Sequence, residues 1–97
     1  MITSFDSPSA GSTVDGAGTY PNSINGSGVI TGSYYKDDYS SHGFVRAADE
    51  TITEFDVPGF ETTPVSINNS GAVTGYYAGS DGYSHGFIGV APYGPTD

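Results

Sequence analysis

The amino-acid sequence predicts an all-β protein built from two copies of one repeat. Two segments align without a gap, Pro21 to Phe44 and Pro64 to Phe87, at a constant offset of 43 residues. Gly or Pro interrupts nearly every window of ten residues and no apolar 3.6-residue period persists, so helices are not expected. Repeats of roughly 40 to 50 residues are typical of propellers, solenoids and arrays. We therefore predict a β-propeller with two four-stranded antiparallel blades per chain.

Each copy contains four short runs of β-forming residues separated by turn-forming residues. The expected strands are Ile2–Asp6, Thr19–Ile24, Val29–Tyr35 and His42–Ala47, then Thr51–Asp56, Thr63–Ile67, Ala72–Tyr77 and His85–Val90. Within a single domain, residues 1–97, the first repeat covers about 2–47 with a loop insertion at 9–20. The second repeat covers about 51–91, and residues 92–97 form a C-terminal tail.

Two blades bury their faces only against further blades on either side, so the prediction includes ring closure by homo-oligomerisation. A trimer with six blades is favoured, and a tetramer is possible. If the strands of a blade run from the hairpin through the HGF strand to the ITxFD strand, the chain starts on the last strand of a blade. Ile2–Asp6 would then complete a sheet in a neighbouring subunit and cover an open sheet edge.

Composition excludes several classes of function. The 97 residues carry a net charge of −9, with Lys36 and Arg46 as the only Lys or Arg, which disfavours nucleic acid and membrane partners. There is no Cys for a disulfide or thiol chemistry, and no cofactor or metal is predicted. No apolar run approaches the roughly 20 residues of a membrane span. The abundance of Gly, Ser, Thr, Asn and Tyr indicates a secreted or cell-surface bacterial protein, although the first residues do not form a signal peptide.

The HGF triplets are interpreted first as packing elements. In a strand, His42 and Phe44 point to one side and Gly43 to the other, so the glycine face can approach the next blade. The same alternation holds for His85, Gly86 and Phe87. Metal ligation or acid–base chemistry by the imidazoles is the alternative. Serine directly precedes each His and faces the opposite side of the strand, so we predict no enzyme activity from this pair.

The loops before the two His residues carry aligned carboxylates, Asp38 and Asp81. Capping of the turn is the favoured interpretation, because the loops lack the alternating acidic ligands and final Glu of a calcium loop. Cation binding is the alternative. Asp6 and Asp56, which are also aligned, are expected to end their strands by the same turn chemistry.

Eight tyrosines in so short a chain indicate either a Tyr-rich surface or a binding site. Tyr34 and Tyr77 share one repeat position and are expected to pack, whereas other tyrosines occupy positions that differ between the copies. Aromatic rings beside polar groups are the materials of sugar recognition, since the ring stacks on the sugar and the polar groups bind its hydroxyls. The candidate ligand-binding residues are Tyr35, Tyr39, Tyr76, Tyr83, Asp38, Asp81, His42 and His85.

The motifs SINxSGxVTGxYY, SHGF and ITxFDxP, spread from Ile2 to Val90, resemble the HGF-containing extracellular repeats of bacterial proteins, often called HAF repeats. That resemblance implies propeller blades and an extracellular setting, and no established activity. In architecture the chain is also similar to two-bladed bacterial lectins that trimerise into six-bladed fucose-binding propellers. Those lectins use Arg, Glu and Trp in their sugar sites, and this chain has no Trp and one Arg.

Taken together, the sequence predicts a non-enzymatic, multivalent binding module for carbohydrate, assembled as an oligomeric propeller. Several equivalent sites on a ring would gain avidity for a surface that displays repeated glycans. The alternative is a purely structural protein or an engineered propeller fragment with no ligand, an interpretation favoured by ends that fall part-way through the repeat.

Overall fold

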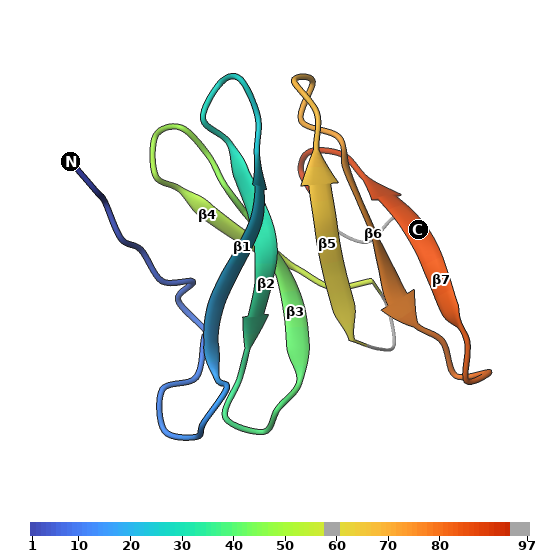
Figure 1. The fold of residues 1–97 in the computed structure, drawn as a ribbon. Coiled ribbons are helices and arrows are strands. Elements are labelled where there is room, and N and C mark those ends of the chain that lie inside the picture. The colour runs from blue at the N-terminus through green and yellow to red at the C-terminus, as the bar shows by residue number, and fades with distance from the viewer. Residues whose placement is uncertain (58–60, 94–97) are drawn as a thin grey trace.

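The chain folds into two antiparallel β-sheets in a computed structural model that describes residues 1–57 and 61–93 (Figure 1). The strands are β1 Gly18–Ile24, β2 Ile30–Tyr35, β3 Ser41–Arg46, β4 Ile52–Phe55, β5 Thr62–Ile67, β6 Val73–Ala78 and β7 Ser84–Gly89. The described residues contain no helix, and therefore none long and apolar enough to cross a membrane. The all-β prediction is confirmed.

The first sheet has the strand order β1-β2-β3-β4 and the second has the order β5-β6-β7. All neighbours are antiparallel, and the matching hairpins have matching registers: Gly32 is paired with Phe44 in the first sheet, as Gly75 is with Phe87 in the second. Both sheets also carry an irregularity in the first strand just after a proline, at Pro21 and at Pro64. The repeat in sequence is therefore a repeat in structure.

The β1–β2 and β5–β6 turns form for the same chemical reason. The side-chain Oδ1 of Asn25 accepts hydrogen bonds from the backbone N–H of Ser27 and Val29, and Asn68 does the same for Ser70 and Ala72. Each turn ends on a glycine with positive φ, 81° at Gly28 and 85° at Gly71, a conformation that L side chains rarely adopt. These residues fix the length of both hairpins.

Seven of the eight predicted strands are present, and their ends differ from the predicted ends by one residue at most. The ITxFD run of the second copy, β4, pairs with β3 of the first copy, so the predicted order of hairpin, HGF strand and ITxFD strand is correct. The strand predicted at Ile2–Asp6 is wrong for the single chain, because these residues form no strand there. The physical reason is that β3, the HGF edge of the first sheet, is already occupied by β4.

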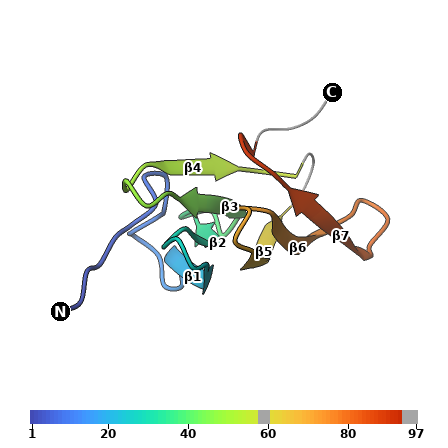
Figure 2. The ribbon, with the colours of Figure 1, turned by 90° about the horizontal axis from the view of Figure 1, so that it is seen from above.

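The second sheet packs over one face of the first, with β5 against β1, β2 and β3 (Figures 1 and 2). The core between the sheets contains Val45, Phe55, Ile67 and Val73, with Phe87 and Tyr93 packed against it. Gly43 permits this approach, because a Cβ there would lie 2.7 Å from the Phe55 ring and 2.9 Å from Pro64. The predicted role of the HGF glycine is confirmed at Gly43.

The opposite face of the first sheet is covered by the N-terminal segment. The Phe5 ring meets the fully buried Phe44 edge-on at 5.8 Å, and the Arg46 guanidinium lies 4.9 Å from the Phe5 ring centre. The carboxylate of Glu54 accepts hydrogen bonds from Ser7 Oγ at 2.6 Å and from Ser9 N–H and Oγ at 2.8 and 2.7 Å. This segment is therefore held against β3 and β4 without joining a sheet.

Within residues 1–57 and 61–93, no segment covers the outer face of the second sheet in this way. Ile88 is 79% exposed, whereas Val45, at the same repeat position, is 3% exposed. Thr74 is exposed and its counterpart Thr31 is buried, and a Cβ on Gly86 would lie 3.8 Å from the nearest atom. Repeat positions that are buried between the two sheets in the first copy are thus exposed on the outer face of the second sheet.

Candidate functional site

A cavity of about 330 Å³ lies where β1 and β2 of the first sheet meet β5 of the second sheet. Its lining combines two aromatic rings with hydroxyl, amide and backbone groups, and comprises Gly16, Tyr20, Asn22, Ser33, Tyr35 and Thr63. These residues come from the loop before β1 and from β1, β2 and β5. None carries a formal charge, which distinguishes the cavity from the strongly acidic chain around it.

The walls of the cavity are held in place by hydrogen bonds and ring contacts. The rings of Tyr20 and Tyr35 meet edge-to-face at 5.3 Å, and the Tyr20 hydroxyl donates to the Gly16 carbonyl at 2.8 Å. The Asn22 amide nitrogen donates to the Pro64 carbonyl at 2.6 Å, which links β1 to β5 across the sheet boundary. The two aromatic walls and the amide are therefore ordered before any ligand arrives.

Ser33 gives the cavity an unsatisfied polar group. Its side chain is 3% exposed, and its Oγ has no hydrogen-bond partner among the described residues. A buried hydroxyl without a partner costs about 1–3 kcal/mol of folding free energy relative to one that is hydrogen-bonded. Because Oγ is itself buried, a hydroxyl or carbonyl group of a ligand would recover that cost only when the lining side chains shift and uncover it.

The residues that line the cavity are also those at which the two copies differ. Tyr20, Asn22, Ser33 and Tyr35 are replaced in the second copy by Thr63, Val65, Tyr76 and Ala78, respectively. The residues that alternate with them along the strands, such as Pro21, Gly32 and Tyr34, are the same in both copies. The scaffold positions therefore repeat while the cavity positions do not.

Of the tyrosines predicted from sequence, only Tyr35 lines the cavity. Tyr39 lies in the turn between β2 and β3 with a positive φ of 67°, and Tyr83 lies in the turn between β6 and β7. Tyr76 is on the outer face of the second sheet. These three rings are exposed and lie outside the lining of the cavity. Sequence reasoning missed Tyr20, Asn22, Ser33 and Thr63, which the difference between the copies would have indicated.

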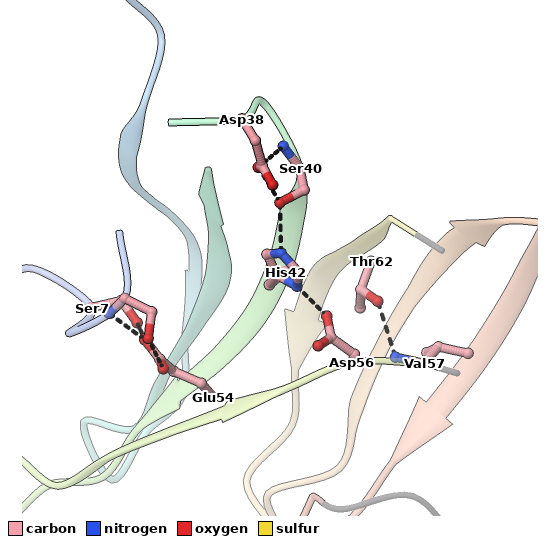
Figure 3. Close-up of polar contacts among 9 residues, drawn as sticks. Ser7, Asp38, Ser40, His42, Glu54, Asp56, Val57 and Thr62 are labelled. Carbon is pink, nitrogen blue, oxygen red and sulfur yellow. Dashed lines mark hydrogen bonds and ion pairs between the residues drawn. The ribbon is translucent and has the colours of Figure 1, made fainter. Parts of the chain in front are cut away.

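Outside the cavity, a chain of hydrogen bonds links four polar residues, Asp38, Ser40, His42 and Asp56 (Figure 3). Asp38 and His42 are among the candidate residues predicted from the sequence. The carboxylate of Asp38 accepts from the N–H and the Oγ of Ser40, at 2.9 and 2.6 Å, which confirms its turn-capping role. Ser40 Oγ lies 2.8 Å from His42 Nε2, and His42 Nδ1 lies 2.5 Å from Asp56 Oδ1. Asp56 directly follows the end of β4, as predicted, and its side chain pairs with His42; the turn that it is expected to cap runs into residues 58–60, which lie outside the described residues.

This chain connects a serine, a histidine and an aspartate in the order used by nucleophilic hydrolases, but the proton of the serine is committed elsewhere. A carboxylate only accepts hydrogen bonds, so Ser40 donates its hydroxyl hydrogen to Asp38, and the direction of its contact with His42 Nε2 depends on the tautomer of the ring. The hydrogen bond from Ser40 holds the pKa of Asp38 below its ordinary value, which keeps Asp38 an acceptor. We interpret the chain as a structural brace between the β2–β3 loop and the end of β4.

The second copy arranges its histidine differently. Asp81 accepts from the N–H of Tyr83 at 3.0 Å, again as a turn cap, and contacts His85 Nε2 directly at 2.9 Å. The hydrogen bonds from Tyr83 and His85 lower the pKa of Asp81. His85 Nδ1 has no partner in the described part of the chain. The two histidine groups are therefore separate, and Figure 1 places both loops at the same end of the sheets.

The paired tyrosines of the repeat, Tyr34 and Tyr77, pack as predicted, and the structure shows that each packs against a histidine ring. The Tyr34 ring stacks on His42 at 5.2 Å, and Tyr77 lies on His85 at 5.4 Å. Burial, together with the negative charges of Glu54 and Asp56, raises the pKa of Tyr34 to about 12. Across residues 1–57 and 61–93, no three His, Asp or Glu side chains are grouped to hold a metal ion.

Comparison of the chain with protein-family models, with curated proteins and with solved structures found no match.

Proposed function

We propose that the chain is a non-enzymatic carbohydrate-binding module that assembles with copies of itself into a closed propeller. The cavity beside Tyr20 and Tyr35 is the sugar site. The observation that supports this most directly is the buried, unpartnered Ser33 Oγ next to two ordered aromatic rings.

The chemistry of the cavity suits a neutral sugar. A tyrosine ring covers the apolar C–H face of a pyranose, and edge-to-face contact between Tyr20 and Tyr35 presents two rings at an angle. Ser33, Asn22 and Thr63 supply hydrogen-bonding groups for the sugar hydroxyls. An anionic ligand would meet no positive charge in the lining and a net charge of −9 around it.

The propeller part of the proposal rests on the repeat. Two sheets with the same strand order and register stack face to face, and the second leaves open the face that the first one buries. Further sheets placed by the same operation would close a ring, as the resemblance to HGF-containing repeats also implies. Three copies are favoured and four are the alternative. One cavity per chain would give such a ring several equal sites, and thus avidity.

The test is a titration of the protein with neutral mono- and disaccharides, chosen from a glycan array and followed by NMR and calorimetry. Signals of Tyr20 and Tyr35 are expected to shift on binding. Tyr35→Ala is expected to weaken binding at least tenfold, since stacking on an aromatic ring is lost. Ser33→Ala should weaken it about three- to tenfold, the loss of one hydrogen bond of roughly 1 kcal/mol.

Tyr39→Ala is the matched control, because Tyr39 is equally aromatic but lies outside the cavity. It is expected to leave the affinity unchanged. If no sugar on a broad array binds a correctly folded sample, or if Tyr39→Ala weakens binding as much as Tyr35→Ala, the sugar site is refuted. The first of these outcomes would favour a purely structural protein or a fragment without a ligand.

A further inference from the structure

We propose that residues 2–6 of one copy join the open edge of β7 in a second copy as its fourth strand, with Asp6 binding His85 Nδ1. The inference depends on the proposed ring but not on the proposed sugar site. It identifies the contact that holds neighbouring copies together.

The first argument comes from the edges of the two sheets. β3 carries β4 on its outer edge, while the equivalent strand β7 pairs only with β6 among the described residues. The strand on β3 has the sequence Ile52-Thr53-Glu54-Phe55-Asp56, and the N-terminal segment reads Ile2-Thr3-Ser4-Phe5-Asp6. The chain therefore contains one vacant strand position and one unpaired segment whose sequence matches the occupant of the equivalent position.

The second argument is that the N-terminal segment already lies where such a strand requires. Phe5 meets Phe44 edge-on at 5.8 Å, as Phe55 meets Phe87 at 6.2 Å. Just beyond these rings, Ser7 N–H donates to Thr19 Oγ1 at 3.0 Å, as Val57 N–H donates to Thr62 Oγ1 at 3.0 Å. All four pairs occupy matching repeat positions.

These matched contacts have a direct geometric meaning. Phe55 is the last residue of β4, a strand of the first sheet, and residues 55–57 make contacts to the second sheet that follows it. Residues 5–7 make the same contacts to the first sheet. They therefore stand in the place of a strand that belongs to a sheet preceding the first one, and a second copy supplies that sheet through its own β5, β6 and β7.

The third argument is the histidine. His42 uses both ring nitrogens, Nε2 toward Ser40 and Nδ1 toward Asp56 at the end of β4. His85 uses Nε2 toward Asp81, and its Nδ1 has no partner within the described residues. Asp6 has the repeat position of Asp56. A strand formed by residues 2–6 on β7 brings the Asp6 carboxylate to His85 Nδ1.

The outer face of the second sheet gives independent support. It has a hollow of about 220 Å³ lined by Ser66, Asn68, Ala72, Val73, Thr74 and Ile88. At the equivalent place on the first sheet, Asn25 donates to the Asn68 carbonyl at 2.9 Å and Gly26 N–H donates to Asn69 Oδ1 at 2.7 Å. The β1–β2 hairpin tip is thus covered by the β5–β6 hairpin tip. The first sheet of a second copy would cover the hollow in the same way.

The exchange must occur between copies and not within one. Figures 1 and 2 place the N-terminal segment and β7 on opposite sides of the molecule. Each copy therefore gives a strand on one side and receives one on the other. Such a head-to-tail contact produces a ring if the rotation closes.

The first sheet defines the register of the exchanged strand. Val45 is opposite Thr53 and Phe44 is opposite Glu54 in the β3–β4 pair. By the repeat, Ile88 of one copy is opposite Thr3 of the next, and Phe87 is opposite Ser4. The double variant Thr3→Cys with Ile88→Cys tests this register, because the natural chain has no cysteine and both positions are exposed in the single chain.

After mild oxidation, the Thr3→Cys/Ile88→Cys protein is expected to give covalent multimers on a non-reducing gel, ending at the mass of the closed ring and reversed by reductant. Ser4→Cys with Ile88→Cys is the control for register, because its two side chains would point to opposite faces of the sheet. The control is expected to cross-link at least tenfold less. Equal cross-linking of the two variants, or none in the first, would overturn the proposal.

Removal of residues 1–6 separates this proposal from the sugar site. The truncated protein keeps every residue of the Tyr20–Tyr35 cavity, so it is expected to lose assembly while binding a soluble monosaccharide with unchanged affinity. Assembly that survives the truncation overturns the strand exchange alone. Sugar binding that is absent from both the truncated and the full-length protein, while the cross-link forms, refutes the sugar site alone.

Discussion

At the scale of single residues, Glu54 shows how one carboxylate fastens a segment that belongs to no strand. It receives three hydrogen bonds from Ser7 and Ser9, and together with the bond from Ser7 N–H to Thr19 Oγ1 these keep the N-terminal segment on the first sheet. Burial alone would raise the pKa of Glu54, but the hydrogen bonds from the two serines and the charge of His42 hold it below its ordinary value.

This lowered pKa has a definite sign in the pH dependence of stability. A carboxyl group whose pKa is lower in the folded state stabilises that state above its ordinary pKa, near 4.3, and the contribution is lost as the pH falls through the lowered value. Glu54→Gln is expected to reduce the free energy of unfolding at pH 7 by about 1–2 kcal/mol, because charge-assisted hydrogen bonds become neutral ones. Urea unfolding of both proteins at pH 7 and pH 3 provides the measurement.

The difference between wild type and Glu54→Gln should shrink as the pH falls toward 3, where Glu54 itself becomes protonated. Glu61→Gln is the control, because Glu61 is exposed. It removes the same charge without these hydrogen bonds, and an equal loss in both variants would assign the effect to net charge instead of to the serines.

The two histidines show that residues at equivalent repeat positions have different hydrogen-bond partners. His42 and His85 share a repeat position and a tyrosine platform, yet they use different nitrogens toward different carboxylates. The difference arises because Ser40 is replaced by Tyr83 and because, among the residues that the structure describes, none takes the place of Asp56 beside His85 Nδ1. A repeated motif therefore predicts where a side chain lies more reliably than what it bonds to.

At the scale of elements, β3 and β7 occupy equivalent positions in their sheets. Gly43 and Gly86 therefore allow the closeness of the neighbouring sheet to be compared at one repeat position. A Cβ on Gly43 would lie 2.7 Å from Phe55 and 2.9 Å from Pro64, whereas one on Gly86 would lie 3.8 Å from its nearest atom. Gly43→Ala is expected to lower the free energy of unfolding by about 1–3 kcal/mol, since the sheets must move apart. Chemical denaturation at low protein concentration measures it.

Gly86→Ala is the companion variant, with an expected change within about 0.5 kcal/mol under the same dilute conditions. Both substitutions replace glycine by alanine in the same strand position, so propensity cancels in the comparison. If Gly86→Ala destabilises the dilute chain as much as Gly43→Ala does, the outer face of the second sheet is not open in solution.

At the scale of the whole molecule, the exposed apolar residues concentrate where the repeat lacks a neighbour. Ile2, Ile88 and Val90 are 96%, 79% and 63% exposed, on the N-terminal segment and on or just beyond β7. Burial of such a side chain contributes about 1.5–3 kcal/mol. A contact between copies that covers all three is favourable before any hydrogen bond of the added strand is counted.

We therefore expect an absolute mass measurement in solution to give a multiple of the 10.0 kDa chain, with three copies favoured over four. Moderate salt is expected to strengthen the assembly, because each copy carries a net charge of −9 and like charges repel. Light scattering after size exclusion, over a hundredfold range of concentration, provides the measurement. A compact, well-folded single chain at every concentration would contradict the ring.

The strands and turns of this protein are predictable from interactions between residues that are close along the chain. Turn residues such as Asn25 and Gly28, strand composition and the constant 43-residue offset specify local conformation, and local conformation depends on neighbours along the chain. These signals located seven strands and the order in which the ITxFD strand follows the HGF strand. They also predicted the spacing role of Gly43 and the turn caps at Asp38 and Asp81.

The contacts between side chains, in contrast, depend on how strands that are distant in the sequence pack in the folded chain. The cavity combines residues from β1, β2 and β5, and the spacing of residues along one strand does not predict that combination. The same holds for Ser33 Oγ, because its lack of a hydrogen-bond partner depends on which other strands pack around it. The pairing of Asp56 with His42, and the absence of a strand at Ile2–Asp6, likewise depend on β4 reaching the edge of β3. Strand pairing and sheet packing bring residues together that are distant in the sequence. This happens because a sheet edge forms hydrogen bonds, and an apolar sheet face is buried, with any element that can reach it.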